Sequence, residues 1–163
     1  MTFSKTAMSS FAAIIALGLG SAAANAATAT ASFNVTATVV ATCSISATAL
    51  AFGNYTGAQT DNTSTISVTC TNTTPYNVLL NPGSATGATV TTRKMTNGAN
   101  TLGYALYSDT GRTVNWGQTV GTDTVAGTGN GSAQTLTVYG RIAAGQLVTP
   151  GSYTDSVTAT VSY

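Results

Sequence analysis

Hydrophobic and polar residues alternate with a period of two along most of the chain. Side chains of a β-strand point alternately to its two faces, so each alternating run predicts a strand with one buried face. The clearest runs place three groups of residues each on one face: Ile66, Val68 and Cys70; Leu102, Tyr104 and Leu106; Leu136, Val138 and Ile142. Glycine, proline and asparagine clusters separate these runs, at residues 81–83, 97–98, 128–131 and 149–151. Short strands between such turns predict an all-β sandwich or barrel.

The longest alternating runs lie near the two ends of the chain. Towards the N-terminus the apolar phase contains Ala29, Ala31, Phe33, Val35, Ala37 and Val39, and towards the C-terminus it contains Tyr153, Val157, Ala159, Val161 and Tyr163. Asp155 also falls on this second apolar phase, and we interpret it as lying at a solvated strand entrance rather than in a buried hydrogen-bonded position. Alternation alone leaves open whether the N-terminal strand pairs within its own chain or with another molecule.

The first 26 residues predict a secretory signal peptide. Lys5 precedes an apolar run over residues 11–19, and Ala24-Asn25-Ala26 has the small-x-small pattern of a cleavage site. We place cleavage after Ala26, with residues 22–24 as the alternative, and expect the segment to be a helix or loose tail packed poorly on the domain. No later apolar run approaches the roughly 18 residues that a membrane span needs, so no membrane insertion is expected. Residues 27–163 suit a single domain.

Charge composition narrows the range of functions. After residue 26 the chain carries four basic residues and four aspartates, with no glutamate or histidine: Arg93, Lys94, Arg112, Arg141, Asp61, Asp109, Asp123 and Asp155. A net charge of zero argues against a nucleic acid partner, whose binding depends on neutralising phosphates, and favours association between copies. Without histidine or clustered carboxylates, we expect no catalytic, metal or cofactor site.

Two cysteines, Cys43 and Cys70, lie in a chain that is expected to be exported. In an oxidising compartment a disulfide is favoured over free or metal-binding thiols. On a chain-entropy basis, closing this loop stabilises the fold by roughly 3–4 kcal/mol.

Four aromatic residues are candidates for a sugar-stacking surface: Tyr104, Tyr107, Trp116 and Tyr139. Aromatic residues on strands more often pack in a core or at an edge, and we favour packing here. The alternative function is therefore an autonomous secreted β-sandwich that coats a cell surface or binds glycans.

An ordered set of short motifs extends over nearly the whole chain after residue 26. It consists of ATCSI (41–45), LAFGNY (50–55), ISVTC (66–70), LGYALYSD (102–109), WG (116–117), LTVYGRI (136–142) and GSYTD (151–155). This set resembles the spore coat protein U domain family, which includes the pilins of archaic (Csu-type) chaperone–usher pili.

The resemblance implies an incomplete immunoglobulin-like β-sandwich of six strands that lacks its seventh. Residues 27–41 would form an N-terminal extension and residues 42–163 the domain. Residues 28–40 would be the donor strand, whose plugging side chains are Phe33, Val35, Ala37 and Val39. Residues 152–163, with Tyr153, Val157, Ala159, Val161 and Tyr163, would form one wall of the receiving groove. The Cys43–Cys70 bridge would tie the first strand to the second.

The same resemblance implies partners and a location. A periplasmic chaperone would fill the groove first, and an outer-membrane usher would exchange it for the extension of an identical or related pilin. The chain would then be a structural pilus subunit, secreted through the periplasm to the cell surface, that supports adhesion and biofilm formation. One domain with an extension resembles a shaft or adaptor subunit, in a fibre or in a coat layer. In a single copy, residues 28–40 are expected either to stay unpaired or to fold back beside residues 152–163.

Overall fold

The computed structural model of the protein describes residues 26–163. The chain divides into two compact units, Met1–Ala37 and Thr38–Tyr163. The predicted signal peptide falls almost entirely outside the described residues, so its helix or loose tail and its cleavage site stay predictions. The described part contains no helix long and apolar enough to cross a membrane.

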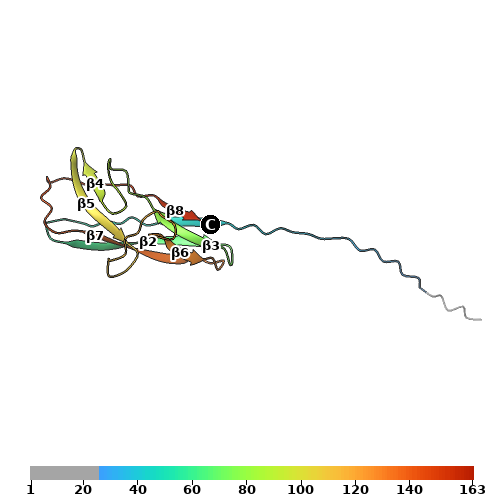
Figure 1. Ribbon diagram of the computed structural model, residues 1–163. Coiled ribbons are helices and arrows are strands. Elements are labelled where there is room, and N and C mark those ends of the chain that lie inside the picture. The colour runs from blue at the N-terminus through green and yellow to red at the C-terminus, as the bar shows by residue number, and fades with distance from the viewer. Residues whose placement is uncertain (1–25) are drawn as a thin grey trace, which may run out of the picture. The chain divides into compact units, whose positions relative to one another are not determined.

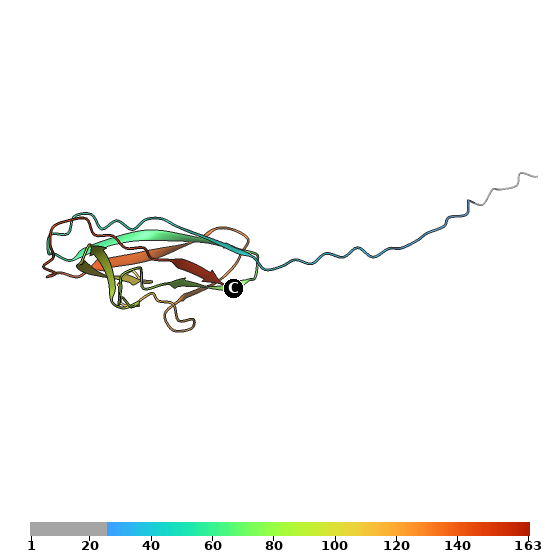
Figure 2. The same ribbon diagram turned by 90° about the horizontal axis from the view of Figure 1, so that it is seen from above.

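Within the described residues, all regular secondary structure is β-strand, and the strands form two sheets (Figures 1 and 2). The strands are β1 (Cys43–Ala47), β2 (Thr60–Cys70), β3 (Pro75–Leu80), β4 (Arg93–Asn97), β5 (Asn100–Tyr107), β6 (Val125–Thr128), β7 (Gln134–Ile142) and β8 (Ala159–Ser162). One sheet has the order β1-β2-β7-β5-β4 and the other the order β6-β3-β8. Every strand pair is antiparallel. The predicted all-β, incomplete immunoglobulin-like class is confirmed.

The number of strands differs from the six expected, because two short edge segments add to the count. β4 forms a hairpin with β5 through the turn at residues 98–99, and β6 pairs with β3. Conversely, only the β8 part of the long strand predicted over residues 152–163 is paired with another strand. Residues 152–158 lack a continuous hydrogen-bonded neighbour, and an alternating sequence pattern cannot supply one.

The core lies between the two sheets and contains the residues that alternation had placed on buried faces. Ile66, Val68 and Cys70 of β2 are at most 2% exposed, and Leu102, Tyr104 and Leu106 of β5 are buried with them. The opposite sheet contributes Tyr76, Val78 and Leu80 of β3, a period-two run after Pro75 that the sequence analysis missed. Trp116 is 1% exposed, and its indole Nε1 donates a hydrogen bond of 2.9 Å to the Val78 carbonyl.

The predicted disulfide is present and joins β1 to β2. Cys43 and Cys70 are directly opposite each other in the register of this strand pair. The bridge therefore fastens the first strand of the domain to the strand beside it.

Arg93, the first residue of β4, is the one charged side chain buried in the described part of the chain, with 0% exposure. Its guanidinium donates hydrogen bonds of 2.7–3.0 Å to four backbone carbonyls, those of Leu80, Asn81, Val90 and Trp116. Burial lowers the pKa of this guanidinium. Arg93 thus links β4 to the end of β3 and to the loop that carries Trp116.

Residues 26–42 have no assigned strand, and their side chains are exposed. Phe33, Val35 and Val39 have exposed fractions of 85%, 83% and 89%. Of the two expectations for a single copy, the unpaired state is therefore the one observed. An exposed run of this kind is unfavourable for an isolated chain in water, because burying large apolar side chains lowers the free energy.

Candidate functional site: an open apolar groove

An open cleft of about 1150 Å³ lies in the Thr38–Tyr163 unit, between the edges of the two sheets. β1 pairs only with β2, and β8 pairs only with β3, so each has one unpaired edge in the described chain. The floor consists of core side chains from five strands: Ile66, Leu80, Met95, Leu102, Tyr104, Leu106, Val138 and Ile142. The groove therefore lies directly over the hydrophobic core, and its floor side chains other than Met95 are at most 9% exposed.

The first wall of the groove is formed by residues 47–55, which continue from β1. It is anchored at three points, two on its backbone and one through a side chain: Thr48 N donates to Thr65 O over 2.9 Å, the Asn62 amide donates to Ala51 O, and the Tyr55 hydroxyl donates to Ala143 O over 2.9 Å. The resemblance included residues 50–55, but the sequence analysis gave them no role in the groove. A wall role could have been suspected from the alternation of Leu50 and Phe52.

Gly140 in β7 makes room for this first wall. A Cβ at this position would lie 2.8 Å from both Leu50 Cδ1 and Phe52 Cζ, closer than packed side chains tolerate. The absence of a side chain lets Leu50 and Phe52 pack directly over β7. The glycine that interrupts the apolar phase between Val138 and Ile142 is thus explained by a close approach.

The second wall is formed by residues 148–159. Thr154 forms an isolated bridge with Thr96 of β4, with mutual backbone hydrogen bonds of 2.8 and 3.1 Å. Asn81 accepts from Thr158 N through its side chain and donates to Thr158 O through its backbone. These contacts hold the wall on the side away from the groove. The edge that faces the groove has no strand partner in the described chain.

Asp155 lies on the second wall, where its surroundings differ from those that the sequence analysis expected. It is half-buried, not at a solvated strand entrance, and it accepts four hydrogen bonds of 2.6–2.8 Å. The donors are the Tyr104 hydroxyl, the backbone and hydroxyl of Ser84, and the Ser156 backbone. The interpretation was wrong because Ser84 and Tyr104 are distant in sequence and reach Asp155 only in the folded sandwich.

These contacts also affect proton affinities on the groove wall. Burial acts to raise the pKa of Asp155, but the hydrogen bonds from Tyr104 and Ser84 outweigh it and hold the pKa below its usual 3.8. Burial and the hydrogen bond to Asp155 raise the pKa of Tyr104. Asp155 is therefore an ionised, fully hydrogen-bonded carboxylate beside an apolar floor.

Three of the five residues predicted for the groove wall line the groove, namely Tyr153, Val157 and Ala159. Val161 packs against the core beyond the end of the groove, and Tyr163 is 60% exposed. The donor residues Phe33, Val35, Ala37 and Val39 lie in the exposed N-terminal segment. Their roles as plugs, and the role of the wall in receiving a strand, stay predictions.

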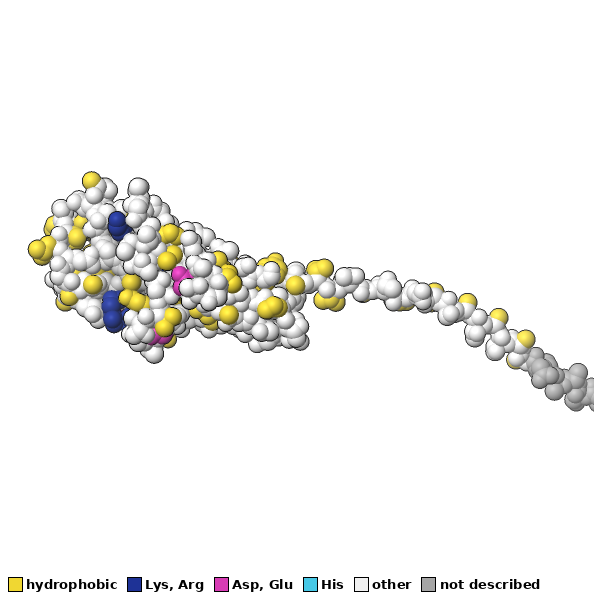
Figure 3. All heavy atoms as spheres, in the orientation of Figure 1, with side chains coloured by type: hydrophobic (Ala, Val, Ile, Leu, Met, Phe, Trp, Pro, Cys, Tyr) yellow, Lys and Arg dark blue, Asp and Glu magenta, His cyan; other side chains and the backbone are white. Residues whose placement is uncertain are grey.

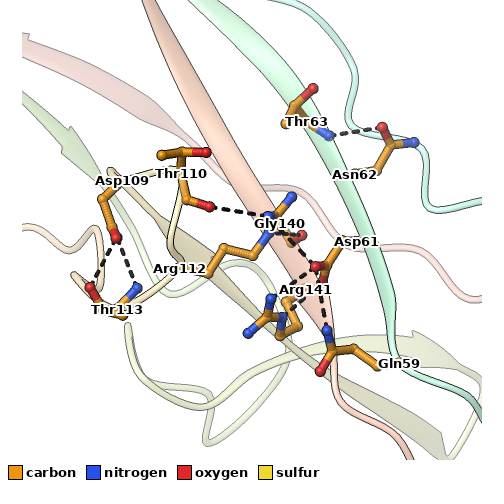
Figure 4. A network of polar contacts seen from close by, with 10 residues as sticks. All are labelled: Gln59, Asp61, Asn62, Thr63, Asp109, Thr110, Arg112, Thr113, Gly140 and Arg141. Atoms are coloured by element: carbon orange, nitrogen blue, oxygen red, sulfur yellow. Dashed lines mark hydrogen bonds and ion pairs between the residues drawn. The ribbon is translucent and has the colours of Figure 1, made fainter.

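Most of the remaining charged side chains have structural partners. Asp61 of β2 is opposite Arg141 of β7, and two hydrogen bonds of 2.8 Å join them (Figure 4). The hydrogen bond from Arg141 lowers the pKa of Asp61, and Arg112 Nη1 lies 3.6 Å from the same carboxylate. Asp109 caps the following loop by accepting from Thr113 and Val114. On the face seen in Figure 3, charged side chains are few and scattered.

No group of three or more potential metal ligands occurs in the described part of the chain. The aromatic residues considered for sugar stacking do not form one surface either, since Trp116 and Tyr104 are buried. Tyr139 instead lies under the Arg112 guanidinium, 5.6 Å from ring centroid to Cζ. The groove is therefore the prominent concave feature of the described domain.

Known proteins are similar to this chain in sequence and in fold. The Spore Coat Protein U domain matches residues 29–160 of this chain. Protein U of Myxococcus xanthus is 36% identical over an alignment of 113 residues, and the match covers 66% of this chain and 63% of that protein. The match thus spans less than two thirds of that relative's length.

Among solved structures, a chain of the CsuC–CsuE chaperone–tip adhesion subunit pre-assembly complex, from archaic chaperone-usher Csu pili of Acinetobacter baumannii, has a TM-score of 0.59 and 22% identity. The superposition covers 77% of this chain and 41% of that one, and it shows a shared fold. The E. coli Hda pilus minor tip subunit HdaB aligns with a TM-score of 0.37 and 21% identity, over 72% of this chain and 79% of its own. Because the family domain matches most of its length, this chain belongs to the Spore Coat Protein U domain family.

Proposed function

We propose that the protein is a structural subunit of a surface pilus that polymerises by donor-strand exchange. Residues 28–40 of one copy would fill the groove of an identical or related subunit, as the added strand between β1 and β8. The observation that carries the proposal is a pair of complementary features in one chain. The domain has an open apolar groove between two unpaired edges, and the N-terminal segment has an exposed apolar phase.

The physical basis is the cost of leaving both features in water. Unpaired strand edges accept an added strand, whose main-chain hydrogen bonds give affinity and whose alternate side chains give specificity. Burying each of Phe33, Val35 and Val39 would contribute about 1.5–3 kcal/mol. The two walls, residues 47–55 and 148–159, are long enough for a donor of about nine residues at about 3.3 Å each.

A subunit with an open groove over its core and an exposed apolar N-terminal segment needs protection before assembly. We therefore assign it a periplasmic chaperone that occupies the groove and an outer-membrane usher that exchanges the chaperone for the next subunit. The protein would be exported through the periplasm and displayed on the cell surface, where the polymer supports adhesion and biofilm formation. The fold shared with a chain of a chaperone–tip adhesion subunit complex supports this assignment.

Single substitutions in the donor phase test the proposal. Val35→Asp in the mature protein should abolish polymer formation, because docking would bury an unpaired carboxylate in an apolar groove. Asn34→Asp is the matched control: it adds the same charge one residue away, on the opposite face of the strand, and should leave polymerisation intact. Polymer length can be followed by electron microscopy and by sedimentation. Equal polymerisation of the two variants would refute donation through this segment.

A deletion variant separates the ability of a subunit to donate a strand from its ability to accept one. A variant lacking residues 27–40 keeps its groove, so mixed with intact subunits it should cap growing polymers and shorten them. The alternative function, an autonomous secreted sandwich that forms a coat or binds glycans, makes a different prediction. In that case the intact mature protein, purified without a chaperone, would be monomeric and stable, and the deletion would have no effect on assembly.

A further inference from the structure

We propose that the outward-facing surface of the five-stranded sheet binds an acidic polysaccharide, through the carboxylate of a uronic acid unit. The site is a shallow hollow of about 340 Å³ over β5, which we call the outer hollow. Its floor lies on the face of the sheet that points away from the core. The inference goes beyond the proposed function and does not depend on strand exchange.

The outer hollow exists because small residues of β5 lie between longer residues of its two neighbours. Gly103 and Ala105 alternate with the buried residues of β5, so they face outwards and form the floor. β4 and β7 flank β5 in the sheet, and they contribute Lys94 and Arg141 to the lining. Strands two places apart are separated by about 9.5 Å, so a ligand can lie over β5 between these two side chains.

Gln146 closes the floor where β7 ends. The pairing of β5 with β7 covers only residues 105–107, so Gly103 has no strand neighbour on that side. The side chain of Gln146 replaces this neighbour: its Oε1 accepts from Gly103 N over 2.7 Å, and its Nε2 donates to Gly103 O over 2.8 Å. The hollow is therefore held open by contacts within the domain and is formed before a ligand arrives.

The lining of the outer hollow is positively charged, and it includes no acidic residue. Lys94 makes no ion pair within residues 26–163. Arg141 uses Nε and Nη2 to bind Asp61, which leaves its Nη1 available to a ligand (Figure 4). Arg112 lies 3.6 Å from the same Asp61, so three basic side chains surround one carboxylate, with a net charge of +2.

This local excess favours an anionic ligand, because the rest of the chain does not supply the missing negative charge. Asp109, in the loop after β5, is directed towards Thr113 and Val114 of its own loop (Figure 4). After residue 26 the chain carries as many aspartates as basic residues, so a positive face on a neutral domain concentrates anions at one place.

The uncharged side chains of the outer hollow fit a sugar. Tyr107 lines the hollow and is directly opposite Tyr139 of β7, and these are the two aromatic candidates for sugar stacking that are not buried. A tyrosine ring offers a flat apolar surface to the C–H face of a pyranose and a hydroxyl to its rim. Thr91 and Thr92 add two hydroxyl side chains on another side. A volume of about 340 Å³ lies within the range of about 300–1,000 Å³ usual for small-molecule sites.

A strip of hydroxyl side chains continues from the outer hollow along the same face of the sheet. It is formed by outward-facing residues of β2 and β7 that are paired in the register of these strands: Thr63, Thr65, Ser67, Thr135 and Thr137. The strip is neutral and contains no aliphatic side chain that would enter a lipid layer. Further sugar units of a polysaccharide can form hydrogen bonds along it, so a sugar polymer suits this face better than a membrane does.

Three polymers distinguish the sugar from its charge. Oligogalacturonate, neutral dextran and poly-glutamate are titrated into the mature protein by calorimetry, with affinity expressed per subunit. We expect binding of oligogalacturonate that weakens as salt is added, because exposed charges are screened. Dextran should not bind measurably, and poly-glutamate, which has carboxylates but no sugar rings, should bind at least about tenfold more weakly, because it lacks the contacts to Tyr107 and the threonines.

Substitutions in the outer hollow locate the site. Lys94→Met should weaken oligogalacturonate binding at least about fivefold, and Lys94→Arg should stay within about twofold of wild type, because the charge is what matters at this position. Ala105→Leu fills the floor and should weaken binding at least about tenfold, because the ligand and the new side chain cannot share the space. Ala126→Leu is the matched control, since Ala126 is an exposed alanine on β6 of the other sheet. Tyr107→Ala, which empties space instead of filling it, should also weaken binding.

The possible results separate this site from the groove. Equal affinity for poly-glutamate and oligogalacturonate would overturn the sugar assignment, and the absence of measurable oligogalacturonate binding at low salt would overturn the proposal as a whole. Unchanged binding by Lys94→Met and Ala105→Leu would overturn the location. Val35→Asp, which is expected to block polymerisation, should bind oligogalacturonate as wild type does; a loss in this variant would show that the sugar needs the polymer and would overturn a site complete within one subunit.

Discussion

The buried guanidinium of Arg93 provides the sharpest test of how the groove is held in shape. Arg93 donates to the carbonyls of Leu80, Asn81, Val90 and Trp116. Leu80 is part of the groove floor, and Asn81 is bonded to Thr158 of the second wall. Arg93→Met keeps much of the side-chain volume and removes all four donors.

The expected loss follows from the carbonyls left behind. The contacts to Leu80 and Trp116 are fully buried, and each carbonyl that loses its donor costs about 1–3 kcal/mol. Removal of a desolvated charge offsets part of this cost. We therefore expect a net loss of about 3 kcal/mol in the free energy of unfolding, or a fall of about 10 °C in Tm. Arg93→Lys, which keeps the charge but has a shorter reach, should lose less.

Urea unfolding followed by tryptophan fluorescence is a direct assay. The chain has a single tryptophan, Trp116, which is 1% exposed and whose carbonyl is one of the Arg93 acceptors. The protein should be kept dilute, and an unfolding midpoint independent of its concentration would exclude a contribution from polymerisation. Lys94→Met is the matched control, since Lys94 makes no ion pair within residues 26–163 and should change stability by less than about 0.5 kcal/mol.

A loss below about 1 kcal/mol for Arg93→Met would refute the reasoning, because it would mean that the four carbonyls find other donors at little cost. An equal loss for Lys94→Met would also refute it, since the effect would then come from removing positive charge in general. A large loss for Arg93→Met alone supports the geometric role of the guanidinium.

Three further predictions concern the groove and its frame. Replacing Cys43 and Cys70 with alanine opens a loop of 27-residue separation and should lower the free energy of unfolding by about 3.5 kcal/mol, measured by urea titration. Gly140→Ala should push Phe52 off β7, costing about 1–3 kcal/mol and weakening binding of a synthetic peptide of residues 28–40, measured by calorimetry. Because the pKa of Asp155 is lowered in the folded state, its contribution is complete above pH 3.8 and is lost as the pH falls below this value. Asp155→Asn should therefore destabilise the protein at neutral pH, and the difference from wild type should shrink in acid.

Much of the sandwich could be predicted from local patterns. The burial of Val68, Leu106 and Ile142 follows from alternation, because a strand turns every second side chain to the same side. The Cys43–Cys70 bridge was predicted from the expected export of the chain and from the placement of the two cysteines on neighbouring strand patterns, and it is present. The run through Val78 was missed, and its alternation is less regular because Leu79 places an apolar residue on the other face.

The polar contacts around the groove could not be predicted in this way. Asp155 depends on Ser84 and Tyr104, which are 71 and 51 residues away in the chain. The burial of Arg93 was not predicted, because nothing near it in sequence indicates that four carbonyls converge on its guanidinium. Such positions are set by strand pairings between distant segments, and hydrogen-bond partners of this kind leave no periodic signal.

The sequence by itself determined which faces of the strands are apolar and that residues 28–40 carry an apolar phase. It also determined the near absence of charge, since composition needs no fold. Only the tertiary structure decided that β1 and β8 would be edges of different sheets and that an open groove would lie between residues 47–55 and 148–159. The reason is physical: alternation specifies which side of a strand is buried, whereas the hydrogen-bonded neighbour is chosen by contacts across the whole chain. An unpaired strand edge can therefore be recognised only when the pairing of every other strand is known.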